Sequence, residues 1–235
     1  MIVLHYWPML ARASGLFRMC AESGTQWRHD TTKVKEMAVL LQPKDQDNGS
    51  STNDTNLAPP IIVDESTGIV LSQSIPSHIY LGNKFGFNKN IPYPELALQY
   101  MHDLNDLHDE MKAAFLKSES TCSLHSLKDY LLGQRYQRHL EAIDRQIKGP
   151  YYFGDMPTYV DFMAASYFEM CEGRWLNPLA EAKHLKCDTI AEHAPKLRGV
   201  LKGIRGLESA STLESIPTVM ANRILTSEQI AAWDN

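Results

Sequence analysis

The sequence predicts a small α/β domain followed by an all-α domain, and three observations support this prediction. Short apolar runs bounded by turn residues, a pattern typical of strands, are confined to the first 72 residues. After residue 94, apolar residues recur at intervals of three and four, as they do in amphipathic helices. A stretch rich in Gly, Asn and Pro lies between the two parts and indicates a linker. We therefore predict domains over residues 1–83 and 95–235, joined by a linker over 84–94.

The first half of the α/β domain alternates strand and helix patterns. Met1–Tyr6 predicts a buried strand, and Leu16–Ser23 predicts a helix that ends near a glycine. Gln26–Asp30 predicts a shorter strand, and Lys33–Leu41 has a weak helical pattern. Residues 44–56 are almost entirely polar and predict a surface loop.

The second half of this domain begins at a pair of prolines. Residues 61–63 predict a strand, 64–68 a hairpin turn, and 69–71 the returning strand. Ser74 is positioned to cap a helix that extends through Leu81, with Pro76 in its first turn. The order strand, helix, strand, strand, strand, helix is a thioredoxin-like arrangement.

The remaining residues carry helical patterns. Thr158 and Asp161 form a capping-box pattern before an apolar helix that reaches about Met170. Residues 195–207 predict another helix, and a short helix or surface tail is expected from residue 227. Two further apolar stripes, each with helical spacing, are Met101, Leu104, Leu107, Met111 and Phe115, and Leu132, Tyr136, Leu140, Ile143 and Ile147.

Composition excludes several classes of function. A net charge of −5 argues against a general nucleic-acid-binding protein, which needs a basic surface. No apolar run approaches the roughly 20 residues that a membrane-spanning helix requires. We expect a cytoplasmic protein, because no secretory signal is visible and the cysteines suit a reducing compartment. The cysteines form no CxxC pair, which argues against a dithiol redox site or a zinc knuckle, and no metal is expected; they are Cys20, Cys122, Cys171 and Cys187.

Two segments about fifty residues apart carry the pattern that points to chemistry. The first is His5-Tyr6-Trp7, which places a phenol at the end of a buried strand. The second runs from Ala58-Pro59-Pro60 through a predicted hairpin to Ser72-Gln73-Ser74, which opens a helix. Taken alone, these patterns indicate a small α/β domain with an anion-binding helix start.

Together the two segments resemble the amino-terminal domain of the cytosolic glutathione transferases, of the tyrosine type found in the mu, sigma and alpha classes. Residues 152–161 also resemble the glycine-aspartate turn and capping box that begin the central helix of that family. The resemblance implies a thioredoxin-like domain followed by a helical domain. It also implies a homodimer and a detoxifying transferase that uses glutathione as its co-substrate.

The resemblance implies that Gln73 and Ser74 hold the γ-glutamyl end of glutathione, where a helix start favours a carboxylate. The structural alternative is that Ser74 is only a helix cap. For the glycine carboxylate, the family's pattern suggests Lys44, with Trp27 and Lys33 as alternatives.

The resemblance assigns activation of the thiol to Tyr6. Lowering the pKa of a thiol by about two units requires roughly 2.7 kcal/mol of preference for the anion. One hydrogen bond to a charged sulfur contributes about 1.5–3 kcal/mol. Arg12 is a second candidate, which would assist ionisation of the thiol. The alternative for Tyr6 is a buried tyrosine whose hydroxyl bonds to a backbone carbonyl, and the alternative for Arg12 is a solvated side chain. Ser14 is a weaker catalytic candidate, because it lies late in the loop and suits a helix cap.

Further family positions contain matches and departures. Pro60 matches the family's cis-proline, but Pro59 before it has no N–H to offer to glutathione. The polar loop over residues 44–56 is longer than in many members. Asp103 resembles the aspartate that reaches the partner subunit's glutathione, with an exposed helix face as the alternative. Trp7 is expected beside glutathione. Together with Met9, Leu10 and the inner faces of the long helices, it is also expected to line the site of the second substrate.

The second substrate is expected to be a hydrophobic electrophile bound in a cleft between the two domains. An isomerase that adds and then releases glutathione is a closely related possibility. A non-catalytic ligand carrier or assembly subunit with the same fold is the alternative of a different class. Retention on immobilised glutathione and conjugation of a chlorinated nitrobenzene would distinguish the enzyme from the carrier.

Overall fold

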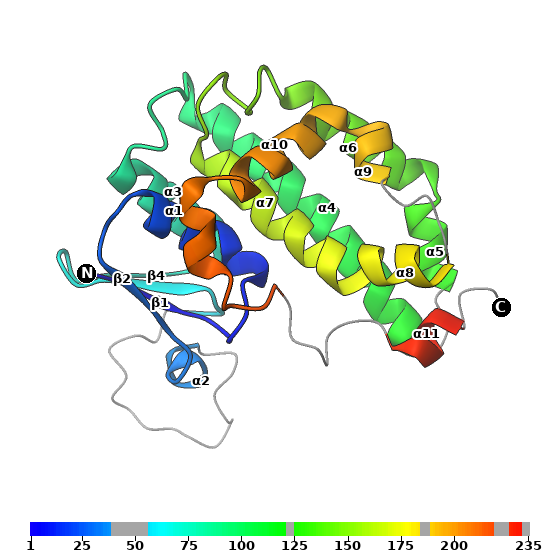
Figure 1. The fold of residues 1–235 in the computed structure, drawn as a ribbon, viewed down its shortest axis with the longest axis horizontal. Helices are drawn as coiled ribbons and strands as arrows, with labels where there is room; N and C mark the ends of the chain where they lie inside the picture. The colour runs from blue at the N-terminus through cyan, green and yellow to red at the C-terminus, as the bar shows by residue number, and fades with distance from the viewer. Residues whose placement is uncertain (39–55, 121–124, 184–188, 219–225, 232–235) are drawn as a thin grey trace.

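The fold combines a small mixed sheet with a larger set of helices, which confirms the predicted fold class (Figure 1). It is seen in a computed structural model that describes residues 1–38, 56–120, 125–183, 189–218 and 226–231. Within these ranges, no helix combines the length and the hydropathy needed to cross a bilayer. The division into domains at residues 83 and 95 stays a prediction.

Four short strands form the sheet in the order β2-β1-β3-β4: β1 (Ile2–His5), β2 (Trp27–Asp30), β3 (Ile61–Asp64) and β4 (Ile69–Ser72). Strand β1 is parallel to β2 and antiparallel to β3, and β3 and β4 form an antiparallel hairpin. Strand β1 is buried along its whole length. Its continuous apolar run is typical of a strand that is covered on both faces.

Helices follow the strands of this first part: the 3-10 turn η1 (Ala11–Ala13), α1 (Ser14–Glu22), α2 (Val34–Met37) and α3 (Ser74–Phe85). The prediction that Ser14 and Ser74 cap their helices is wrong. Both are first residues of their helices, and the caps are Ala13 and Gln73, neither of which makes a side-chain capping bond. Helix α3 is also longer than expected. It ends at Phe85 and is followed by the cap residue Gly86, whose φ of 82° places it in the left-handed conformation.

The second part is helical in every described element: α4 (Pro94–Ser120), α5 (His125–Leu131), α6 (Gln134–Gln146), α7 (Tyr159–Cys171), the π-helix η3 (Glu172–Leu176), α8 (Asn177–Lys183), α9 (Thr189–His193), α10 (Pro195–Arg205), the 3-10 helix η4 (Glu208–Leu213) and α11 (Ser227–Ala231). Leu132 was expected in an apolar stripe with residues of α6. It lies instead in the turn between α5 and α6 and is 65% exposed.

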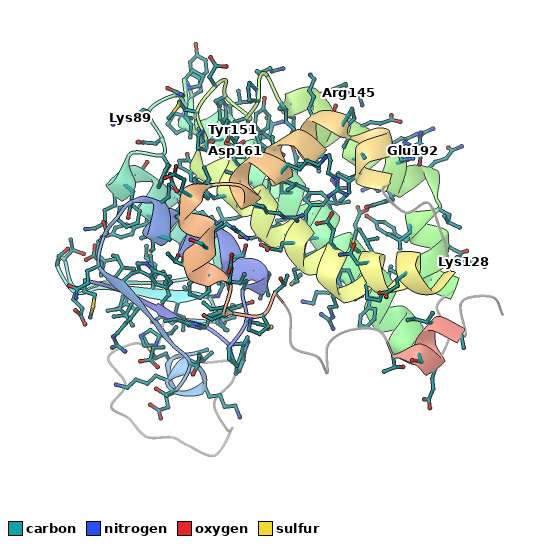
Figure 2. The ribbon with its side chains drawn as sticks, in the orientation of Figure 1. Lys89, Lys128, Arg145, Tyr151, Asp161 and Glu192 are labelled. Atoms are coloured by element: carbon teal, nitrogen blue, oxygen red, sulfur yellow. The ribbon has the colours of Figure 1, made fainter. Side chains whose placement is uncertain are left out.

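Helix α7 is the centre of the molecule and is buried on nearly all sides, as a helix that is apolar all round must be. It packs against α1 and α3 of the first part and against α4 and α10 of the second. The predicted capping box begins it, with Thr158 N–H donating to Asp161 Oδ2 at 2.7 Å. Asp161 also accepts the Tyr152 N–H at 2.8 Å, and Figure 2 labels it at this end of α7, near Tyr151. The core is therefore continuous across the two parts.

Candidate active site

The register of the sheet brings three predicted site segments together at one end of its strands. This end of the strands is called the sheet edge. Strands β1 and β4 end, and β3 begins, at this edge, where His5 pairs with Ile61 and Ile61 with Ser72. The residues that continue these strands therefore lie side by side: Tyr6, Pro60 and Gln73. The peptide bond between Pro59 and Pro60 is cis, as expected.

Tyr6 is held at this edge by its main chain. Its N–H donates to Asp30 O at 3.3 Å, and its carbonyl lies 3.1 Å from His29 Nε2. The side chain is only 3% exposed, yet it lines a cavity. Burial raises the pKa of the phenol, and the nearby Arg12 guanidinium opposes part of that shift. Tyr6 is therefore a protonated hydrogen-bond donor at neutral pH.

Arg12 lies in η1, directly after the loop that follows Tyr6. Its Nη2 donates to Pro59 O at 3.4 Å and so links this loop to the proline pair. Ala11, just before it, has a φ of 34°, a conformation that is costly for a residue with a side chain. The Leu10 and Ala11 N–H groups each donate at 2.8 Å to carbonyls of the carboxy-terminal segment, those of Pro217 and Thr218. The loop that contains the strained Ala11 is thus held by the proline pair on one side and by the carboxy-terminal segment on the other.

The start of α3 lies at the same edge of the sheet. Gln73 has a φ of 75° and a ψ of 151°, which a non-glycine residue adopts only where its surroundings impose it. Ser74 is buried, and helix α3 runs for 12 residues beyond Gln73. The start of such a helix presents backbone N–H groups and a partial positive charge.

The His78 side chain bonds to the first residue of α3. Its Nδ1 lies 2.8 Å from Ser74 O and 3.3 Å from Ser74 Oγ, so Nδ1 carries the proton and donates to the carbonyl. Its Nε2 is buried and has no hydrogen-bond partner among the described residues. Burial lowers the pKa of His78 from 6.5 to about 4, since the charged ring would bury an unpaired donor.

Acid should destabilise the protein through His78. A histidine whose pKa is lowered by folding contributes stability above pH 6.5 and loses it as the pH falls towards 4. We expect wild-type unfolding free energy to fall by about 3 kcal/mol more than that of His78→Asn over this range. Urea unfolding of both proteins from pH 7 to pH 4 measures the difference. A stability difference that stays constant with pH would contradict this role.

A cavity of about 170 Å³ opens beside Tyr6, between the first loop and the helical part. The sequence predicts a cleft between the domains that is lined by Trp7, Met9 and Leu10 and by the inner faces of the long helices, and Trp7 and Met9 do line this cavity. Its complete lining is Tyr6, Trp7, Met9, Ala11, Arg12, His108, Lys112, Met170 and Arg174. Gln73 and Ser74 do not line it. Tyr6 therefore belongs both to the cavity lining and to the sheet-edge cluster, which consists of Tyr6, Pro60 and Gln73.

The lining residues of the helical part were missed by sequence reasoning. His108 and Lys112 lie on α4, and His108 follows Leu104 by four residues on the buried stripe of that helix. A polar residue within an apolar stripe was the signal available for His108. Met170 and Arg174 come from the end of α7 and from η3, and no sequence pattern indicates that this helix changes to a π-turn there.

Histidine 108 is buried to 97%, with its ring stacked on Tyr167 at 4.8 Å between centroids. Its Nδ1 lies 3.2 Å from Asp109 Oδ1, so Nδ1 carries the proton and donates to the carboxylate, and Nε2 is unprotonated. Nε2 has no partner among the described residues. Burial lowers the pKa of His108, and the bond to Asp109 opposes this in part. The ring is neutral where it lines the cavity.

Several other predicted residues lie away from the cavity. Leu10 does not line it, because its side chain is buried and faces the segment around Leu213 and Ile216. Asp103 accepts a 2.5 Å bond from Gln146 of α6. Ser14 Oγ donates to Glu169 at 2.5 Å within the core. Neither Trp27 nor Lys33 is part of the cavity lining. Lys44 lies outside the described residues.

Comparison with known proteins identifies the fold. No protein-family model and no curated protein matches the sequence. Solved structures do match. A glutathione S-transferase from Methylobacterium radiotolerans in complex with glutathione sulfonate is 17% identical, with a TM-score of 0.61. The glutathione S-transferase from Ascaris lumbricoides is 16% identical, with a TM-score of 0.60, and rat hPGDS in complex with a quinoline is 14% identical, with a TM-score of 0.61.

Each of these three alignments covers 96% of this chain and 98% of the other. The likeness therefore extends through both the sheet and the helices. At this level of identity it is a likeness of fold, and the residues of the site have to be judged on their own chemistry. The chain has the two-part fold of the glutathione transferases.

Proposed function

We propose that this chain is a glutathione transferase that activates the glutathione thiol as a thiolate for attack on an electrophile. The observation that supports this most strongly is the meeting of Tyr6, the cis Pro59–Pro60 bond and the start of α3 at one edge of the sheet, beside a cavity. The complex of the Methylobacterium protein with glutathione sulfonate supports glutathione as the ligand.

Glutathione binds with its γ-glutamyl carboxylate at the start of α3, where Gln73 and Ser74 hold it. The helix start supplies N–H donors and a favourable potential for an anion. The strained conformation of Gln73 supports this role, because such strain is typical of ligand-binding positions. Lys44 stays the candidate for the glycine carboxylate, and Pro59, Pro60 and Trp7 are the candidates around the cysteine.

Tyr6 stabilises the thiolate through its hydroxyl. The thiol proton passes to water, Tyr6 donates a hydrogen bond to the sulfur anion, and the sulfur electron pair forms a bond to the electrophilic carbon. The bond to the leaving group breaks, and that group departs with its electron pair. Tyr6 acts as a donor and not as a base, since burial raises the pKa of its phenol. Arg12 adds positive charge near the sulfur and orients the loop through Pro59.

The test is a pair of measurements on the purified protein. We expect glutathione to bind, as measured by calorimetry, and 1-chloro-2,4-dinitrobenzene to be conjugated faster than the uncatalysed reaction at equal glutathione. Absence of both binding and conjugation would overturn the proposal.

A non-catalytic carrier is the second candidate, and one feature favours it. Pro59 has no N–H for the cysteinyl part of glutathione, and its carbonyl accepts a bond from Arg12. Glutathione binding without conjugation of any electrophile would support the carrier and reject the enzyme.

The tyrosine-type class, a homodimer, a role in detoxification and a cytoplasmic location are expectations that follow from the resemblance of the sequence. In the homodimer Asp103 would face the partner subunit's glutathione. Light scattering after size-exclusion chromatography tests the dimer, and a monomer at micromolar concentration would contradict it.

A further inference from the structure

The side chains around the cavity carry a charge opposite to that of the whole chain. The sequence contains 28 acidic and 23 basic residues and has a net charge of −5. Around the cavity, however, the charged residues are Arg12, Lys112 and Arg174, and no Asp or Glu is among the lining residues that the structure describes. Three cations that converge on one small cavity favour an anionic ligand.

Arg174 reaches the cavity because the end of α7 changes its winding. In η3 the backbone takes a π-turn, and a π-turn within a helix is frequent at functional sites. The Arg174 guanidinium lies over the rings of Phe115 and Trp175, at 4.7 Å and 5.2 Å from their centroids. Trp175 itself is fully buried, so the π-turn anchors one residue in the core and directs its neighbour to the cavity.

Lys112 approaches the same end of the cavity from α4. It precedes Phe115 by three residues and follows His108 by four, and side chains at these intervals share a helix face. Because Arg174 lies over Phe115, Lys112 and Arg174 are on neighbouring parts of the lining. Lys112 is exposed and makes no ion pair with any acid in the described part of the chain.

The two ends of the cavity therefore differ in their chemistry. Tyr6 and Arg12 lie at the sheet edge, where the sulfur of glutathione is proposed to lie. Lys112 and Arg174 lie on the helical side, and the rest of the lining is mostly apolar: Trp7, Met9, Ala11 and Met170. His108 is also part of the lining, and its ring is neutral.

We infer that the second substrate is an apolar electrophile that carries an anionic group, of which a carboxylate is the simplest, and that Lys112 and Arg174 bind this group. The inference deepens the proposed transferase function and rests on it. The apolar walls hold the body of the substrate, and the pair of cations orients its electrophilic carbon towards Tyr6. An uncharged electrophile of the same shape would gain only the apolar contacts.

Two chlorinated nitroaromatics test this preference: 4-chloro-3,5-dinitrobenzoate and its methyl ester. In both, the glutathione sulfur forms a bond to the ring carbon that bears chlorine, chloride leaves with the bonding pair, and the thiol proton passes to water. Each kcat/KM is divided by the rate constant of the uncatalysed reaction, because the ester activates the ring more strongly. We expect the wild-type ratio to favour the acid by about tenfold, equivalent to about 1.4 kcal/mol.

Matched variants assign the preference to the cavity. Lys112→Gln and Arg174→Gln should each lower kcat/KM for the acid by about tenfold while leaving the ester within about twofold. Lys202→Gln is the control, since it removes the same charge from an exposed position on α10 outside the cavity lining. Glutathione affinity should be unchanged in all three. Equal use of acid and ester, or loss of glutathione affinity instead of acid preference, would overturn the inference.

A binding measurement separates this inference from the proposed function. 3,5-Dinitrobenzoate and its methyl ester have no chloride to lose, so their affinities, measured by quenching of tryptophan fluorescence, require no catalysis. Tighter binding of the acid that is lost in Lys112→Gln supports the anion-binding cavity even if conjugation fails. In that case the transferase proposal alone is rejected. Equal binding of acid and ester in the wild type rejects the anion-binding cavity, whether or not conjugation occurs.

Discussion

Replacing Tyr6 with phenylalanine is expected to lower kcat/KM for conjugation of 1-chloro-2,4-dinitrobenzene by about 10- to 100-fold. The change removes one hydroxyl and keeps the buried ring. One hydrogen bond to a charged group contributes about 1.5–3 kcal/mol, and each 1.4 kcal/mol corresponds to a factor of ten. The pKa of the thiol in the glutathione complex should rise by about one to two units for the same reason. The ultraviolet absorbance of the bound thiolate, followed against pH, measures this directly.

Tyr152→Phe is the matched control. Tyr152 is fully buried, its hydroxyl has no hydrogen-bond partner among the described residues, and it does not line the cavity. Its substitution should leave both the thiol pKa and kcat/KM within about twofold of the wild type. If Tyr6→Phe left the thiol pKa unchanged, Tyr6 would not be the donor, and the proposed mechanism would fail.

Gly15→Ala is expected to destabilise the protein by about 3 kcal/mol or more, the upper range for overpacking of a core. A Cβ at this position would lie 2.2 Å from the Phe162 carbonyl oxygen and 2.6 Å from His78 Nε2. The carbonyl belongs to the backbone of α7, so it cannot rotate away as a flexible side chain would. Gly15 N–H also donates to Ser166 Oγ at 2.5 Å, and separating α1 from α7 would break this bond. Urea unfolding at neutral pH measures the loss.

Gly199→Ala provides the comparison. Gly199 is an exposed residue of α10, and a Cβ there would meet no atom within 4 Å. Alanine is favoured over glycine in a helix, so this variant should be as stable as the wild type or up to about 1 kcal/mol more stable. Equal stability of Gly15→Ala and the wild type would show that α1 and α7 can separate freely, contrary to the packing described above.

Much of the first part of the fold could be predicted from the sequence, because its signals are local. Strand β1 is a continuous apolar run, and the hairpin of β3 and β4 has a clear turn between its strands. The capping box of Thr158 and Asp161 was confirmed for the same reason, since its partners are three residues apart. The helix caps at Ser14 and Ser74 were predicted wrongly. A serine before an apolar helix favours a cap, but here Ser14 turns inward to Glu169 and Ser74 to His78.

The particular residues that the helical part contributes to the cavity could not be predicted in this way. Lys112 and Arg174 are 62 positions apart, and each looks like an ordinary helix cation in the sequence. The π-turn that directs Arg174 towards the cavity depends on how α7 and η3 pack, which no local preference records. The stability of such a turn comes from tertiary contacts such as the burial of Trp175.

The order of the strands and the main helices of the first part, and the residue types near the ends of its strands, can be predicted from the sequence alone, because alternation and turns are properties of neighbouring residues. The tertiary structure brings Tyr6, Pro60 and Gln73 together through strand register, and it places the cations of α4 and η3 in the lining of the cavity. These contacts depend on strand pairing and helix packing, which join residues far apart in the chain and whose geometry is set by the whole core.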